Sequence, residues 1–108
     1  MSELKEKHCK PCESGTNPFN SEQIKKYLEK LPAGWEVKED KIIKKSFPFE
    51  NFKQGMAFAQ NVANVAEEEQ HHPDVCIQYK NVDVNLTTHS IGGLSENDFI
   101  MASKIEEL

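Results

Sequence analysis

Three of the four histidines of this chain lie close together in a stretch that also carries carboxylates. His71 and His72 are adjacent, with Glu67 just before them, and His89 and Asp98 follow. Histidine is the side chain whose ordinary pKa lies nearest neutrality, so neighbouring histidines can exchange protons at physiological pH. No cysteine pair at zinc-ligand spacing lies beside them. The stretch therefore predicts proton transfer as its chemistry.

The bulk properties predict one small acidic domain. The chain has 108 residues and a net charge of -5, which disfavours direct binding to the phosphate backbone of nucleic acids. Cysteine is sparse (Cys9, Cys12 and Cys76), and the start of the chain has no apolar signal region. We therefore expect a reducing, cytoplasmic setting. No apolar run approaches the length needed to span a membrane.

Residues 1–18 read as a poorly structured leader in which few residues could be buried, and residues 19–108 read as the single domain. The leader carries Cys9-Lys10-Pro11-Cys12, a CxxC pattern that would fit half a zinc site or a redox pair. A full zinc site needs four ligands, so distant residues would have to complete it.

The first elements of the domain are a helix and a hairpin. Asn20 has a capping side chain, and apolar residues follow at helical spacing as far as Leu31. Alternating residues over 35–47 then flank Glu39-Asp40, which predicts two strands joined by a tight turn.

A long helix and a second hairpin follow. Residues 50–70 contain no proline and carry a wide apolar face, and Pro73 cannot continue the helix. Two alternating segments then flank a turn at Lys80-Asn81, and a last helix runs from Ser95 to the end of the chain. The order α-β-β-α-β-β-α predicts an α+β fold in which three helices pack on one face of a four-stranded antiparallel sheet.

The second hairpin brings the histidines together. In its last strand the even-numbered apolar residues face the core, so His89 lies at the strand end on the opposite face. A turn at Lys80-Asn81 sets Tyr79 opposite Val82 and His72 opposite His89. To within a residue or two, this register gathers three histidines at one end of the sheet.

Other interpretations of the same residues remain open. Asp98 lies three residues after Ser95, where an acidic side chain can serve only to cap the helix. Zinc could use His71, His89 and a carboxylate, although adjacent histidines fit the wall of a pocket better than a chelate. Cys76 lies near the cluster but has no neighbour in the sequence that would activate a thiol.

The pattern Glu67-x3-His71-His72-Pro73-x5-Tyr79-x9-His89-x8-Asp98 closely resembles the signature of the pterin-4a-carbinolamine dehydratases, also called 4a-hydroxytetrahydrobiopterin dehydratases. The resemblance covers roughly residues 20–108 and extends to residues 31–35, 47–52, 87–89 and 93–96.

The resemblance implies a lyase without a cofactor or metal. Such an enzyme removes water from the 4a-hydroxytetrahydropterin released by aromatic amino acid hydroxylases and yields quinonoid dihydropterin. By resemblance, His71 and His89 are the acid and base, His72 holds the substrate, and Asp98 and Glu67 support the histidines. The residues implied to line the pterin site are Gln70, His71, His72, Thr87, Thr88, His89 and Ser90.

The resemblance also implies partners. Family members dimerise by joining sheet edges, and some pair dimers into tetramers through helices. Some also bind the dimerisation region of a transcription factor as a coactivator, so a protein-interaction module is the alternative to an enzyme.

Overall fold

The computed structural model describes residues 4–10 and 17–108 and has the predicted α+β class. Cys12 lies outside the described residues, so half of the CxxC pattern has no structural account. The elements are η1 (Leu4–Glu6), α1 (Ser21–Leu28), β1 (Glu36–Lys38), β2 (Ile42–Pro48), α2 (Phe52–Glu69), β3 (Asp74–Ile77), β4 (Asn81–Leu86), η2 (His89–Ile91) and α3 (Glu96–Ile105).

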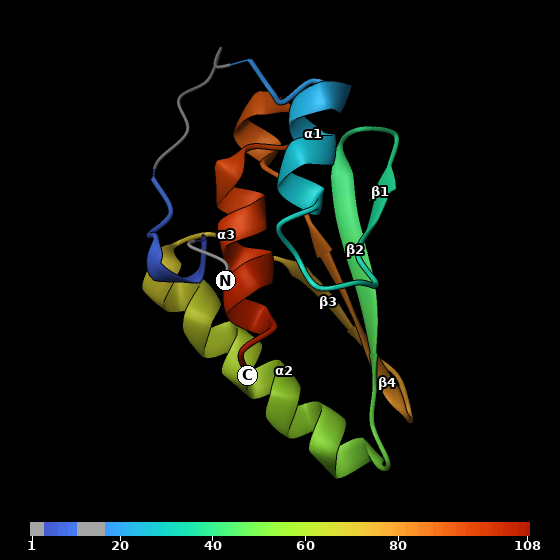
Figure 1. Ribbon diagram of the computed structural model, residues 1–108. Coiled ribbons are helices and arrows are strands. Elements are labelled where there is room, and N and C mark those ends of the chain that lie inside the picture. The colour runs from blue at the N-terminus through green and yellow to red at the C-terminus, as the bar shows by residue number, and fades with distance from the viewer. Residues whose placement is uncertain (1–3, 11–16) are drawn as a thin grey trace.

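The four strands form one antiparallel sheet in the order β1-β2-β4-β3. Figure 1 shows the helices on one side of this sheet, where α2 and α3 pack against β4 and α1 packs on α3. Val82, Val84 and Leu86 are fully buried beneath them, as the alternating pattern predicts. Within residues 4–10 and 17–108, no helix covers the opposite face of the sheet.

The first hairpin turns where the sequence predicts. Glu39 and Asp40 both take left-handed backbone conformations, with φ of 54° and 56°. Two consecutive residues of this kind match the right-handed twist of the flanking strands.

The second hairpin differs from the prediction by two positions. Ile77, not Tyr79, lies opposite Val82, and the turn is formed by Tyr79 and Lys80. Asn81 belongs to β4, where it pairs with Pro48 of β2, and its side-chain amide donates to Asp83 at 2.9 Å. Pairing ends at Asp74, so His72 and His89 are not strand partners.

Helix α2 buries only part of its apolar surface. Its core face includes Gly55, Phe58 and Val62, whereas Phe52 and Met56 are exposed. Gly55 allows close packing because an added Cβ would lie 3.3 Å from a methyl carbon of Val82.

The described part of the leader packs onto the domain. Leu4 is buried in the hydrophobic core, an exception to the expectation that few residues before 19 would be buried. Segment 4–10 contacts α3 and the end of α2. Among the described residues, no helix combines the length and apolarity that crossing a membrane requires.

Candidate functional site

His71 lies where α2 gives way to β3, and a buried carboxylate holds it. Gln70 ends the helix in a left-handed conformation (φ 55°), and the His71 backbone N–H donates back to the Ala66 carbonyl at 3.2 Å. This turn directs the imidazole toward α3. There His71 Nε2 lies 2.7 Å from Asp98 Oδ1, with the His71 side chain 12% exposed and the Asp98 side chain 0% exposed.

Asp98 closes the N-terminus of α3 as well as contacting His71. Its Oδ2 accepts the Ser95 backbone N–H at 3.0 Å, which is half of the capping box, and the Thr88 hydroxyl at 2.8 Å. A buried carboxylate needs donors to offset the loss of hydration, and three groups supply them here. Asp98 is therefore both a helix cap and the partner of His71.

This arrangement fixes the roles of the two His71 ring nitrogens. An ionised carboxylate can only accept, so Nε2 carries the proton that is shared with Asp98. Nδ1 is then the atom that can take up or release a proton. A carboxylate that holds an imidazole in this way fixes the orientation of the ring, which acid–base catalysis requires.

A cavity of about 490 Å³ lies beside His71. From the residues implied by resemblance, its lining includes Gln70, His71, Thr88 and Ser90. The volume lies within the usual range for small-molecule sites. The cavity is therefore the candidate site for a substrate that exchanges protons with His71.

His89 lies next to this cavity rather than at the end of a strand. It begins η2 and is exposed, and its chain neighbours Thr88 and Ser90 both line the cavity. Thr88 is anchored by pairing with Gly93, which fixes the base of this short loop.

Three of the implied residues point elsewhere. The exposed His72 lies 2.6 Å from Glu67, and both line a groove between α2 and β3 rather than the His71 cavity. Ion pairs exposed to this degree contribute little to stability. The Thr87 hydroxyl donates to the Lys41 carbonyl at 2.6 Å and so faces the first hairpin.

Sequence reasoning missed residues that also line the cavity, namely Cys9, Lys10, Glu68, Glu69 and Asn97. One of them left a signal, because Glu69 continues the buried row of Phe58, Val62 and Ala66 at helical spacing. Cys9 and Lys10 left none, since their positions beside the cavity depend on contacts with Glu69 and Asn97, which are distant in the sequence.

Glu69 is ionised although it is buried. Burial alone would raise its pKa, but the Cys9 N–H and the His8 side chain donate to its oxygens and Lys104 lies nearby. Together these contacts hold the pKa of Glu69 below its ordinary value. The C-terminal turn of α2 thus carries a fixed negative charge beside the cavity.

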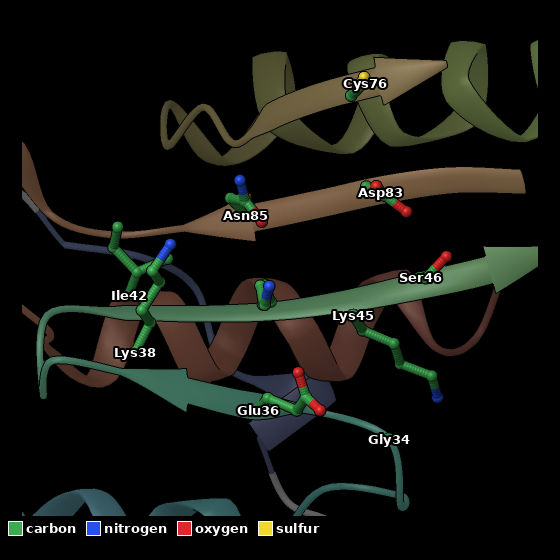
Figure 2. Close-up of a pocket in the computed structure, with 10 residues that line it drawn as sticks. Gly34, Glu36, Lys38, Ile42, Lys45, Ser46, Cys76, Asp83 and Asn85 are labelled. Atoms are coloured by element: carbon green, nitrogen blue, oxygen red, sulfur yellow. The ribbon is translucent and has the colours of Figure 1, made fainter. Parts of the chain in front are cut away.

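The uncovered face of the sheet carries a separate hollow of about 410 Å³. Figure 2 shows Cys76, Asp83 and Asn85 pointing into it from β3 and β4, with Ser46 on β2. No histidine lines this hollow, and Cys76 lies on it rather than on the His71 cavity. The proton-transfer residues and this thiol therefore belong to different surfaces.

The described residues contain no group of three or more histidine, cysteine, aspartate or glutamate side chains that could hold a metal ion. The cavity instead offers an oriented imidazole, hydroxyl groups and backbone groups. This donor set suits an organic substrate with hydrogen-bonding edges.

Comparison with known proteins identifies the family to which this chain is similar. Residues 17–108 match the family model described as pterin 4 alpha carbinolamine dehydratase. A protein from Rubrobacter xylanophilus, named provisionally as such an enzyme, is 41% identical over 100% of both chains. One from Legionella pneumophila (strain Lens), with the same provisional name, is 47% identical over 99% of this chain and 96% of its own.

Two solved structures of proteins described as pterin dehydratases or pterin dehydratase-like have the same fold. A Brucella melitensis protein described as a transcriptional coactivator/pterin dehydratase is 35% identical, with a TM-score of 0.78 over 84% of this chain and 97% of its own. A pterin dehydratase-like protein described as a RuBisCO assembly factor shares the fold, with a TM-score of 0.59 over 68% of this chain and 87% of its own at 21% identity. The chain belongs to the pterin 4 alpha carbinolamine dehydratase family.

Proposed function

We propose that this protein removes water from a 4a-hydroxytetrahydropterin to give the quinonoid dihydropterin. One observation carries the proposal: an imidazole held by a buried carboxylate lines a cavity of suitable size. Family membership supports the choice of pterin as the substrate class.

The reaction needs one proton delivered and one removed. The C4a–O bond breaks, and the leaving hydroxyl takes a proton from an acid and departs as water. The ring N5–H gives its proton to a base, and the electrons of that bond form the C=N bond. No external oxidant or reductant takes part, so no cofactor is needed. Catalysis of this kind typically contributes about 10²–10⁴-fold.

We assign His71 and His89 as the acid–base pair, with Asp98 as the residue that orients His71. Thr88 and Ser90, together with the Gln70 backbone, would hold the edge of the pterin. His72 and Glu67 would act at the rim, since they line the neighbouring groove. Thr87 would support the loop through its bond to Lys41 rather than touch the substrate.

The test is a dehydration assay on 4a-carbinolamine that an aromatic amino acid hydroxylase generates in situ. We expect His71→Ala and His89→Ala each to lower kcat by about 10²-fold or more. Glu36→Gln is the matched control, because Glu36 lines the hollow on the uncovered sheet face. Full activity in a variant carrying both histidine changes would refute the assignment.

A second function is favoured by the description of the Brucella structure and by exposed apolar side chains. Phe52 and Met56 on α2 are 47% and 44% exposed and could receive a protein partner. Under this alternative the protein acts as a coactivator. A partner captured equally well by the parent and by the His71→Ala, His89→Ala variant would support it.

We further propose a homo-oligomer in the cytoplasm. Strand β3 is a sheet edge, and its Val75 and Ile77 are each 37% exposed. A second copy pairing at this edge would cover both side chains and satisfy the unpaired backbone groups.

A further inference from the structure

The N-terminal segment 4–10 forms part of the wall of the His71 cavity. Cys9 and Lys10 line the cavity together with His71. Leu4 anchors the start of the segment in the hydrophobic core. The matched part of the family model, residues 17–108, begins after this segment.

Asn97, a buried residue of α3, binds the segment at two points. Its Oδ1 accepts the Lys10 backbone N–H at 3.0 Å, and its Nδ2 donates to the Lys10 carbonyl at 2.5 Å. An amide side chain bound to both polar groups of one residue fixes the position and orientation of that residue. The Cys9 thiol adds a contact to the Asn97 carbonyl at 3.6 Å.

Glu69, at the end of α2, is the second anchor. Its Oε1 accepts the Cys9 backbone N–H at 2.7 Å, and its Oε2 lies 2.9 Å from His8 Nδ1. Hydrogen bonds to an ionised carboxylate are stronger than those between neutral groups. Lys104 lies 3.5 Å from the same oxygen, so the charge is compensated within the domain.

Both anchors lie close in sequence to the His71–Asp98 pair. Asn97 directly precedes Asp98, and Glu69 is separated from His71 only by Gln70. The backbone at Cys9 and Lys10 is therefore held in a defined position relative to the His71–Asp98 pair. A surface tail without a role at the site would not need two buried polar anchors, because each must offset its own desolvation.

We propose that residues 4–10 form one wall of the pterin site and that Glu69 and Asn97 are positioning residues that hold this segment in place. The inference rests on the proposed function and adds a substrate contact that the matched domain does not supply. A pterin in the cavity touches Cys9 or Lys10 on one side and His71 on the other. The wall governs substrate affinity, while the histidines govern the chemical step.

The experiment measures binding of 7,8-dihydrobiopterin to the full-length protein by titration calorimetry, together with kcat and KM for dehydration. We expect Asn97→Ala to weaken binding and raise KM by about tenfold, because two hydrogen bonds that position the wall are lost. We expect kcat to stay within about twofold, since His71 and Asp98 are unchanged. Glu69→Gln, which keeps the side-chain shape, should weaken binding in the same direction.

Lys5→Ala is the matched control. Lys5 belongs to the same segment 4–10, but its side chain pairs with the exposed Glu107 near the C-terminus and does not line the cavity. This variant should bind the pterin as the parent does. If Asn97→Ala does not fold, Glu69→Gln decides alone. Parent-like affinity in the folded Asn97 and Glu69 variants, or equal weakening by Lys5→Ala, would overturn the inference. A parent protein that binds no pterin would refute the proposed function, and this inference with it.

Discussion

At the scale of single residues, Asp98 contacts both the N-terminus of α3 and the proposed acid–base residue His71. One of its carboxylate oxygens contacts His71, and the other closes the capping box of α3 through the Ser95 N–H. The sequence leaves two alternatives open, helix cap and catalytic support. The structure shows that one side chain makes both sets of contacts.

A pair of variants separates the two roles. Ser95→Ala removes the capping hydroxyl but keeps the Asp98–His71 contact, so we expect a loss of about 1 kcal/mol in the free energy of unfolding with little change in kcat. Asp98→Asn should lower stability and also lower kcat by at least about tenfold, because an amide can donate to His71 and reverse its tautomer. Urea unfolding and the dehydration assay measure the two effects. Equal kcat in both variants would contradict the orienting role.

The charge of Glu69 gives stability a dependence on pH. Its pKa is lower in the folded state than its ordinary value of 4.5. The folded state therefore binds a proton at Glu69 less readily than the unfolded state. The contribution of Glu69 to the free energy of unfolding is thus fully present above the unfolded pKa. The contribution is lost as pH falls through the lowered folded pKa.

Glu69→Gln provides the test, since glutamine does not titrate. The free energy of unfolding of the parent, measured in urea, should fall as pH drops below about 4.5. The free energy of unfolding of the variant should fall less steeply over the same pH range. Glu22→Gln, on the exposed face of α1, is the control and should follow the parent. Identical declines in the Glu69 variant and the parent would contradict the assignment.

At the scale of elements, the close approach of α2 to the sheet depends on Gly55. An added Cβ would lie 3.3 Å from Val82 Cγ2, so a larger side chain must push the helix outward. Because the same helix ends at Glu69, two residues before His71, its position also sets that of the imidazole.

Gly55→Val should therefore lower the free energy of unfolding by about 1–3 kcal/mol through overpacking. Ala57→Val, at an exposed position of the same helix, should cost only the difference in helix propensity, about 0.5 kcal/mol. Thermal or urea unfolding distinguishes them. A Gly55 variant as stable as the Ala57 variant would show that α2 can shift without cost.

The elements themselves could largely be predicted because their signals are local. The Asn20 cap, the Glu39-Asp40 turn and the alternation in β4 depend on near neighbours in the chain. The predicted turn of the second hairpin is misplaced because Asn81 pairs with Pro48 on β2, and its side-chain amide also donates to Ser46 on that strand. No local pattern reports such a contact.

The site was predictable in composition but not in grouping. The pairing of His71 with Asp98 joins a residue that follows α2 to a residue of α3, and the sequence indicates each one separately. His72 and Thr87 were grouped with His71 by proximity in the chain, yet they face other surfaces. The chain leaves the helix at Gln70, and Pro73 favours an extended conformation at His72, so the two adjacent histidines project toward different partners.

At the scale of the whole molecule, helices cover one face of the sheet, and β3 is an edge strand. Val75 and Ile77 on this edge border an apolar groove against α2 that includes Ala59 and Ala63. An uncovered apolar edge strand favours association with another chain.

Ile77→Lys should disfavour this pairing, since lysine at an edge opposes strand addition. If the parent is an oligomer through β3, the variant should shift toward monomer in sedimentation analysis. Lys80→Ala, in the adjoining turn, is the control and should leave the assembly unchanged. An unchanged mass for Ile77→Lys would move the interface to another surface.

The double use of Asp98 also bears on how relatives should be interpreted. A descendant of this fold that gave up catalysis and kept only a binding role would still need a carboxylate to cap α3 and to satisfy Thr88. Selection for folding would retain it after selection for turnover had ended. The presence of this aspartate in a relative is therefore weak evidence of activity, whereas loss of the imidazole beside it would be a far better sign that an enzyme has become a binding protein.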